Sequence, residues 1–208
     1  MQNVFTDCGM DFMFNKVSNC NKIKTYTRNC INISINNFHS KWYENVRTKS
    51  SLSDYALIKD KPYLEDYLLN ILDFYAASLK FKARSNTLPI NGRSYHWNID
   101  HDKVCPLCKT GKEDLKHFLF TCRTLQDIRI AEFHKLEHNL CSNELNSFWH
   151  LFISSNLNIK TCLMLGVSEG LISDHAVDFD FKPVLGIFDI FCKSYLKIAW
   201  KFRSDFLN

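Results

Sequence analysis

Three cysteines and one histidine lie close together near the middle of the chain, in the stretch VCPLCKTGKEDLKHFLFTC. Cys105 and Cys108 are separated by two residues, and His117 and Cys122 follow downstream. Thiolate sulfur and imidazole nitrogen are the ligands that tetrahedral zinc prefers in proteins. The residue types and their spacing therefore predict one zinc ion bound by these four side chains. Because four protein ligands close the coordination sphere, the ion is expected to be structural and not catalytic.

The residues between the ligands suit a small metal-binding unit. Pro106 and Gly111 favour a tight turn at the first ligand pair, since glycine tolerates backbone angles that other residues resist. The segment EDLKHFLF is expected to form a short helical turn, with Leu115, Phe118 and Leu119 packed beneath the site. Metal binding would supply about 10–16 kcal/mol of local folding free energy, which so short a segment cannot gain from packing.

Two other interpretations of the cysteines are weaker. Unrelated buried thiols would need no metal, but the polar residues around Cys105 and Cys108 disfavour burial of this pair. A dithiol redox site would need the first cysteine at the N-terminus of a helix that follows a strand, whereas a polar turn with Gly111 follows here. The other cysteines show no ligand spacing, and three of them are expected in the core: Cys141, Cys162 and Cys192.

The chain is mildly basic, with a formal charge of +4 and a pI near 8.5. Between Lys80 and Lys135 eleven basic residues stand against six acidic ones, an excess of +5 that accounts for the whole net charge. A positive potential there would attract phosphate groups. Tyr95 and Trp97 are expected either to stack on unpaired bases or to pack against the zinc unit. The residues predicted to contact nucleic acid are Lys80, Lys82, Arg84, Arg93, Tyr95, Trp97, Lys109, Lys112, Lys116, Arg123 and Arg129.

Helices are expected to position these residues. Only six Gly and four Pro interrupt the chain, and apolar residues recur at helical spacing. We expect helices from Pro62 to about Lys82, from about Arg123 to Leu140, over 142–155 with Ser142 as the N-cap, and from Pro183 onward. The inner face of the last helix is predicted to comprise Leu185, Phe188, Phe191, Tyr195, Ile198 and Phe202.

The sequence thus predicts a mostly α fold, a helical domain with a small central CCHC zinc-knuckle-like unit. Four regions are expected along the chain. They are a weakly ordered leader (1–37), a helical basic segment (38–104), the CCHC zinc unit (105–122) and a C-terminal helical region (123–208).

Several stretches together resemble a known family. KFKARSNTLPINGR, then CPLC, HFLFTC and LQDIR, resemble the zinc-binding region near the C-terminus of non-LTR (LINE-type) retrotransposon reverse transcriptases. The resemblance covers roughly residues 40 to 135. It places Arg84, Gly92 and Arg93 on the family's basic segment and Arg129 on the helix after the cluster. It implies a role in gripping template RNA or target DNA within a retrotransposon ribonucleoprotein.

No catalytic site is expected. The chain lacks the Tyr/Phe-x-Asp-Asp stretch that holds polymerase metals. HKLEH (134–138) matches an inverted zinc-protease pattern, but an exposed helix with two histidines is the better interpretation. Asp100-His101-Asp102 has no acidic or histidine partner placed by the sequence and is expected to be a solvated loop.

The function expected from the sequence is a zinc-stabilised nucleic-acid-binding module that lacks a polymerase active site. Its partners would be the RNA or DNA backbone, through phosphate contacts and limited stacking. The alternative is a protein-interaction domain with structural zinc and no nucleic-acid role. A signal peptide and a membrane-spanning stretch are not expected, so the predicted location is intracellular, nuclear or cytoplasmic.

Overall fold

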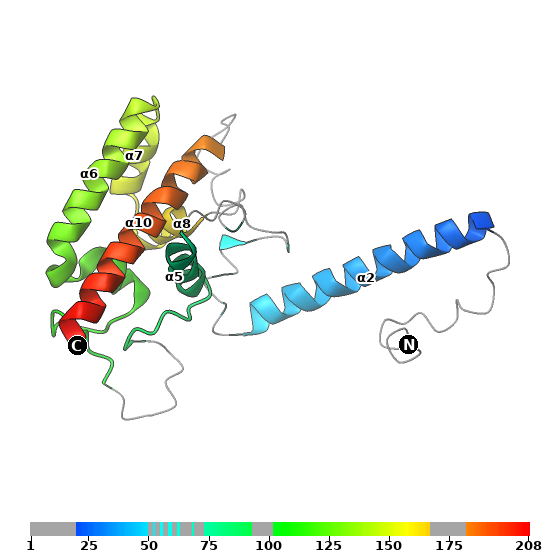
Figure 1. Cartoon of the computed structure of the whole chain (residues 1–208), viewed down its shortest axis with the longest axis horizontal. Coiled ribbons are helices and arrows are strands. Elements are labelled where there is room, and N and C mark those ends of the chain that lie inside the picture. Colours follow the sequence, from blue (N-terminus) through cyan, green and yellow to red (C-terminus); the bar gives the residue numbers. More distant parts are fainter. Residues whose placement is uncertain are drawn as a thin grey trace. The chain divides into compact units, whose positions relative to one another are not determined.

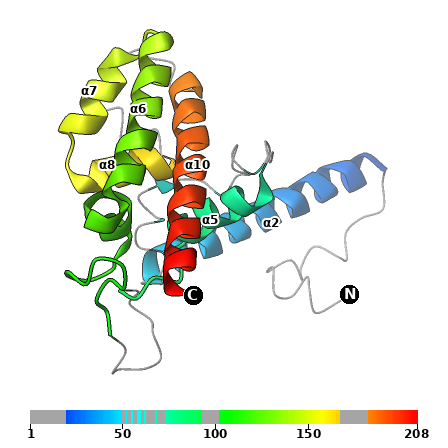
Figure 2. The ribbon, with the colours of Figure 1, turned by 60° about the vertical axis from the view of Figure 1, so that its left-hand side comes forward.

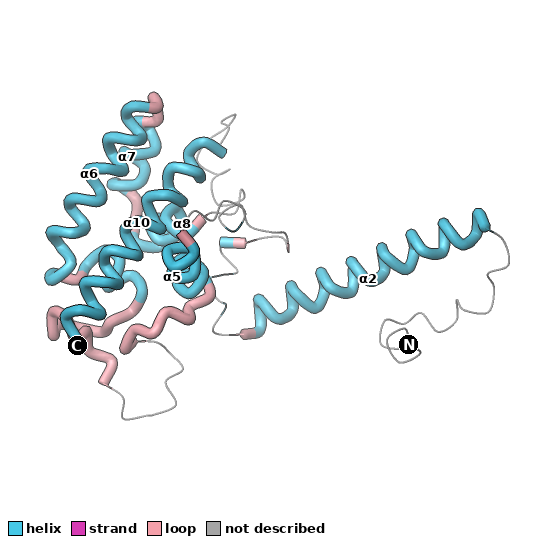
Figure 3. The backbone as a smooth tube through the Cα atoms, in the orientation of Figure 1, coloured by secondary structure: helices cyan, strands magenta, loops and turns pink. Residues whose placement is uncertain are grey.

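The computed structural model describes four stretches of the chain and a few single positions between residues 50 and 72. The stretches are 20–49, 73–92, 102–166 and 182–208. The chain divides into two compact units, Met1–Lys49 and Ser50–Asn208. Helices dominate both units (Figures 1 and 3), and the only β pairing among the described residues is an isolated bridge between Val104 and Lys112. The predicted mostly α fold is confirmed.

The first unit contains one long helix, α2, which spans Cys20–Thr48. The sequence predicted weak order up to residue 37 and a short helix only afterwards. The prediction is wrong for residues 20–37, because α2 runs through that boundary without a break. Residues 1–19 of the predicted leader lie outside the described residues.

Helix α5 spans Phe74–Arg84, within the first continuously described stretch of the second unit. Asp73 caps it, since its carboxylate accepts a hydrogen bond from the Ala76 N–H at 3.0 Å while its own backbone is extended. The helix predicted from Pro62 to about Lys82 is therefore wrong in its continuity, because it is interrupted at Asp73; most of residues 62–72 lie outside the described residues. The helix ends at Arg84, two residues beyond the predicted end.

Four further α-helices lie in the described part of the second unit. They are α6 (Gln126–Ser142), α7 (Asn146–Ser154), α8 (Leu157–Leu165) and α10 (Lys182–Leu207). Helix α10 packs against α5, α6 and α8 and is the central element of this unit (Figure 2). The predicted N-cap at Ser142 is wrong, because that residue ends α6 and α7 begins at Asn146.

An aromatic cluster fills the space between α6, α7 and α10. The ring of Phe133 lies 5.4 Å from that of Phe152, 5.5 Å from Phe191 and 6.1 Å from Tyr195, measured between centroids. Most of these contacts are tilted or edge-to-face, the geometry that aromatic quadrupoles favour. The cluster holds α10 against α6. It therefore also fixes the positions of the side chains that these two helices direct toward the loop between α5 and α6.

The inner face of α10 differs from its predicted composition toward the C-terminus. Phe188, Phe191 and Tyr195 are buried as expected, but Ile198 and Phe202 are 38% and 36% exposed. Ala199 and Arg203 take the inward positions instead. Arg203 can face inward because it pairs there with the buried carboxylate of Glu113. The predicted core cysteines Cys162 and Cys192 are buried, whereas Cys141 is exposed.

Candidate metal centre

The first ligand pair sits in a tight turn built by backbone hydrogen bonds. The Lys109 N–H donates to the Cys105 carbonyl and the Cys105 N–H donates to the Gly111 carbonyl, both at 2.9 Å. Lys109 and Gly111 adopt positive φ values of 57° and 71°. Glycine takes such angles without steric cost, so the predicted turn role of Gly111 is confirmed. The Val104–Lys112 bridge closes the base of the turn.

The second ligand pair is held by a single π-helical turn over His117–Thr121. The Cys122 N–H donates to the His117 carbonyl at 2.8 Å, five residues back, and this wider turn brings both side chains to one side. Asp114 accepts from the His117 N–H at 2.8 Å and fixes the start of the turn. Thr121 Oγ1 lies 3.2 Å from His117 Nδ1, which leaves Nε2 directed at the cysteines.

The four side chains converge on one point. Their ligand atoms all lie within 4.8 Å of one another. Cys105 Sγ is 3.9 Å from Cys122 Sγ, and Cys108 Sγ is 3.3 Å from His117 Nε2. Metal–sulfur bonds of about 2.3 Å and metal–nitrogen bonds of about 2.0 Å at tetrahedral angles require about 3.8 Å and about 3.5 Å for these separations. The geometry can hold one metal ion, and the three cysteines are free thiols.

The three cysteines of the cluster differ in how deeply they are buried. Cys105 and Cys122 are 1% and 0% exposed, so the expectation that the polar surroundings keep Cys105 out of the interior is wrong. Desolvation raises the pKa of the Cys105 thiol to about 12 and also raises the pKa of Cys122. Cys108 is only partly buried. Desolvation opposes its ionisation too, but hydrogen bonds with Thr110, Cys105 and His117 outweigh it and lower its pKa to about 6.

Side chains from helices α6 and α10 donate hydrogen bonds to the backbone around the second ligand pair. Arg129 on α6 donates from Nε to the Leu119 carbonyl at 3.1 Å and from Nη2 to the Cys122 carbonyl at 2.6 Å. The Tyr195 hydroxyl on α10 donates to the same Leu119 carbonyl at 2.8 Å. Arg129 was predicted to contact nucleic acid, but its described contacts make it a positioning residue for the metal segment.

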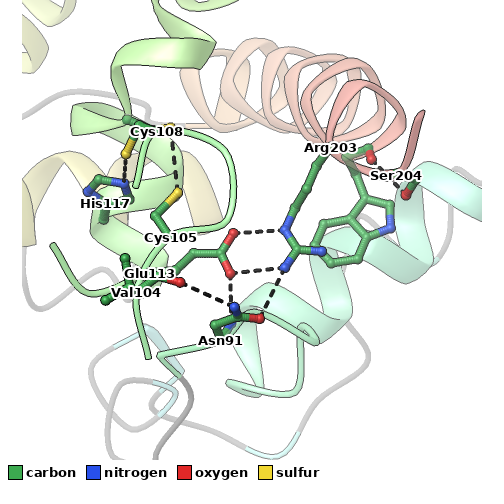
Figure 4. Close-up of polar contacts among 10 residues, drawn as sticks. Asn91, Val104, Cys105, Cys108, Glu113, His117, Arg203 and Ser204 are labelled. Atoms are coloured by element: carbon green, nitrogen blue, oxygen red, sulfur yellow. Dashed lines mark hydrogen bonds and ion pairs between the residues drawn. The ribbon is translucent and has the colours of Figure 1, made fainter. Parts of the chain in front are cut away.

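A buried ion pair joins the first ligand pair to α10 (Figure 4). Arg203 donates from Nε and Nη2 to the two carboxylate oxygens of Glu113, at 2.7 and 2.9 Å. Glu113 is 0% exposed and also accepts from the Asn91 N–H at 2.7 Å. Sequence reasoning missed this pair because the two residues lie far apart in the chain and no local pattern connects them.

Gly92 lies directly against this segment. Its N–H donates to the Glu113 carbonyl at 2.9 Å. A Cβ atom at residue 92 would lie 2.5 Å from that carbonyl oxygen, closer than any tolerated contact. Asn91-Gly92 is therefore the point where the chain before the metal segment packs against it.

Two residues predicted to contact nucleic acid are instead part of the core. Lys80 and Arg84 are each 2% exposed. The Lys80 ammonium pairs with Asp189 on α10 at 2.7 Å, and Arg84 Nη1 donates to the Leu165 carbonyl. Their prediction as surface contacts is wrong, because the apolar stripe of α5 carries both of their side chains toward α10 and α8.

The remaining predicted contacts divide by location. Lys82, Lys109, Lys112 and Arg123 are exposed, and Lys116 is half-buried. All of them except Lys82 lie next to or between the metal ligands in the sequence. Three further predicted contacts lie outside the described residues: Arg93, Tyr95 and Trp97.

The HKLEH pattern does not form a second metal cluster. His134 and His138 are exposed on α6, and His134 Nδ1 pairs with Glu137 at 3.3 Å. Throughout the part of the chain that the structure describes, the Cys/His cluster is the only group of three or more ligating side chains close enough to share an ion. The predicted exposed helix is confirmed.

Comparisons with known proteins give no counterpart of this chain. No protein-family model, no curated protein and no solved structure matches it. Among the described residues, every helix is too short or too polar to cross a membrane.

Proposed function

We propose that this chain is a zinc-stabilised nucleic-acid-binding module similar to the C-terminal part of a non-LTR retrotransposon reverse transcriptase. The observation that carries the proposal is the convergence of four ligand atoms within 4.8 Å, in a segment that exposes Lys109 and Lys112 and is followed by the exposed Arg123. RNA or DNA phosphates, within a retrotransposon ribonucleoprotein, are the proposed partners.

Zinc is the ion that the donor set favours. Three thiolates and one imidazole in a tetrahedral arrangement are typical of structural zinc, and such a set leaves no open position for water or substrate. When bound, the ion supplies folding free energy to a segment that has little regular structure. Cys105, Cys108, His117 and Cys122 would hold it.

Surface lysines and arginine, and not the ion, would attract phosphates. Zinc with three thiolates carries a net charge of about −1. Lys109, Lys112 and Arg123 are exposed beside it. The nearby acid Glu113 does not cancel them, because its charge is already paired with Arg203 in the interior.

The packing of Gly92 supports the family resemblance. In the resembled family a Gly-Arg pair ends the basic segment before the zinc ligands. Gly92 packs against the backbone of Glu113, and Arg93 follows it directly in the sequence. A requirement for glycine at residue 92 thus has a physical cause that fits the family pattern.

The test is a titration of labelled single-stranded RNA and duplex DNA at two salt concentrations. Removing one phosphate contact lowers the slope of log K against log salt by about 0.7 for single strands and about 0.9 for B-DNA. Lys112→Gln and Arg123→Gln are expected to weaken binding and lower the slope, whereas Lys160→Gln on α8, outside the metal segment, serves as the control.

The alternative function predicts a different outcome. A protein-interaction domain with structural zinc would contain the metal yet bind neither nucleic acid in a salt-dependent way. That result, with folded metal-loaded protein, would replace the proposed function by this alternative.

A further inference from the structure

The two units of the chain differ sharply in charge. Residues 1–49 contain seven Lys or Arg and three Asp or Glu, which leaves +4. Residues 50–208 contain nineteen of each and are neutral. The basic window predicted between Lys80 and Lys135 is therefore balanced within its own unit, and the first unit equals the net charge of the whole chain.

Helix α2 carries this charge. It contains five Lys or Arg, six Asn and a single acid, Glu44. With 100° between successive residues, one sector of about 100° contains exposed cations and amides and no acid. This Arg/Asn face comprises Arg28, Asn29, Asn32, Asn36, Tyr43 and Arg47, all of them exposed, and the buried Val46 lies at its edge. The Arg47 guanidinium lies over the Tyr43 ring, 5.9 Å from its centroid.

The composition of α2 gives the helix little stability of its own. Asn, Thr and β-branched Ile have modest helix propensity, and the first turn has no acidic residue to complement the helix dipole. Ile31, Ile35 and Phe38 remain 54%, 45% and 58% exposed, so burial of apolar surface contributes little over the middle of the helix. A binding partner of opposite charge would offset both deficits.

We propose that the Arg/Asn face of α2 is a second nucleic-acid contact that lies in the major groove of duplex DNA. This inference rests on the proposed function. It specifies the helix that makes the contact, the face of that helix and the form of nucleic acid that is bound. Arginines pair with phosphates or guanine edges, and asparagine amides match adenine edges. The major groove of B-DNA is about 12 Å wide and admits a helix, whereas that of A-form RNA is too narrow.

The arrangement of charge argues against an anionic membrane as the occupant. An interfacial helix needs a continuous apolar face flanked by cations. On α2 the apolar row Ile31, Ile35, Phe38 and Trp42 continues toward the N-terminus into Lys24 and Arg28, both exposed. Cations therefore interrupt the row in the N-terminal half of the helix, so α2 lacks the continuous apolar face that an interfacial helix needs.

The experiment uses the full chain loaded with metal and three probes: a labelled DNA duplex, single-stranded RNA of the same sequence, and vesicles rich in anionic lipid. Arg28→Gln and Arg47→Gln remove cations from the face. Lys41→Gln removes the same charge from the opposite side of the same helix, where the residue is equally exposed. Circular dichroism of each variant reports whether the helical content is unchanged.

We expect each arginine variant to weaken duplex binding about fivefold or more and to lower the salt slope by about 1, while Lys41→Gln changes the affinity by less than about twofold. Equal losses for all three variants would overturn a defined face, and losses confined to single-stranded RNA or vesicles would overturn duplex DNA. If the arginine variants bind normally while Lys112→Gln and Arg123→Gln fail, this inference falls and the proposed function stands.

Discussion

At the scale of single residues, each cysteine contributes to the site according to where it lies. Cys122 is buried and Cys108 is partly exposed, yet both are needed for four-coordination. We expect Cys108→Ser and Cys122→Ser to reduce bound metal to well below one ion per chain, as measured by inductively coupled plasma mass spectrometry. The exposed Cys141 lies outside the cluster, so Cys141→Ser should keep its metal. A variant of Cys108 with full metal content would remove that residue from the site.

The Arg203–Glu113 pair should be costly to break. Glu113 is fully buried, and Arg203→Met would leave its carboxylate without a cation. Breaking a buried pair on one side costs about 3–5 kcal/mol, which urea unfolding would measure. Adding Glu113→Gln to Arg203→Met should recover part of the loss, because the buried charge then disappears. A single-variant loss below about 1 kcal/mol would contradict a buried, paired carboxylate at this position.

Tyr195 should make the free energy of unfolding depend on pH in a defined direction. Burial raises the pKa of its phenol from 10.0 to about 12. Between these values the unfolded chain loses the proton and the folded chain keeps it, so the stability that Tyr195 contributes is complete below pH 10 and falls as the pH rises. Tyr195→Phe should cost about 1 kcal/mol near pH 8 through removal of the hydrogen bond to Leu119.

The difference in free energy of unfolding between the unaltered protein and Tyr195→Phe should vanish by about pH 11. Urea unfolding at about pH 8 and about pH 11 would show this. A difference that stayed constant would mean that the phenol is not buried in the folded protein.

At the scale of elements, the close packing of Asn91-Gly92 on the metal segment makes a matched comparison possible. Gly92→Ala would place a methyl group 2.5 Å from the Glu113 carbonyl oxygen, and we expect a loss of about 1–3 kcal/mol in the free energy of unfolding. At Gly186 in α10 a Cβ atom would meet no other atom within 4 Å, so Gly186→Ala should instead stabilise by about 0.5–1 kcal/mol. Equal effects of the two substitutions would contradict the described packing.

The elements also show what a sequence can predict here. The metal ligands were predictable because their spacing is local and each residue type has one dominant chemistry. The limits of α5 and α7 were not, because Asp73 caps a helix inside an apolar run and Glu144, at a φ of 60°, terminates α6 beyond Ser142. The inward turn of Arg203 depends on Glu113, a partner whose position only the folded chain defines.

At the scale of the whole molecule, the metal segment is joined to α10 by three contacts. They are Arg203 to Glu113, the Tyr195 hydroxyl to the Leu119 carbonyl, and Trp200 edge-on to Phe118 at 5.9 Å. Removing the metal with a chelator should therefore destabilise part of α10 as well as the segment that carries the ligands. We expect hydrogen exchange to quicken over residues 102–125 and over the last two turns of α10.

The N-terminal half of α10 provides the internal control for that experiment. Phe188 packs on Phe152 of α7, with ring centroids 5.5 Å apart and no ligand between them. Amides around Phe188 should keep their protection after chelation. Uniform loss along the whole helix would instead mean that the second unit unfolds as one cooperative body, and no change anywhere would mean that the metal does not stabilise the fold.

The central claim is that Cys105, Cys108, His117 and Cys122 bind one zinc ion, and X-ray absorption at the zinc edge of the purified protein tests it most directly. We predict one zinc per chain, surrounded by three sulfur atoms at about 2.3 Å and one nitrogen atom at about 2.0 Å. A protein that is folded without zinc, or a zinc ion surrounded only by oxygen and nitrogen, would contradict that claim.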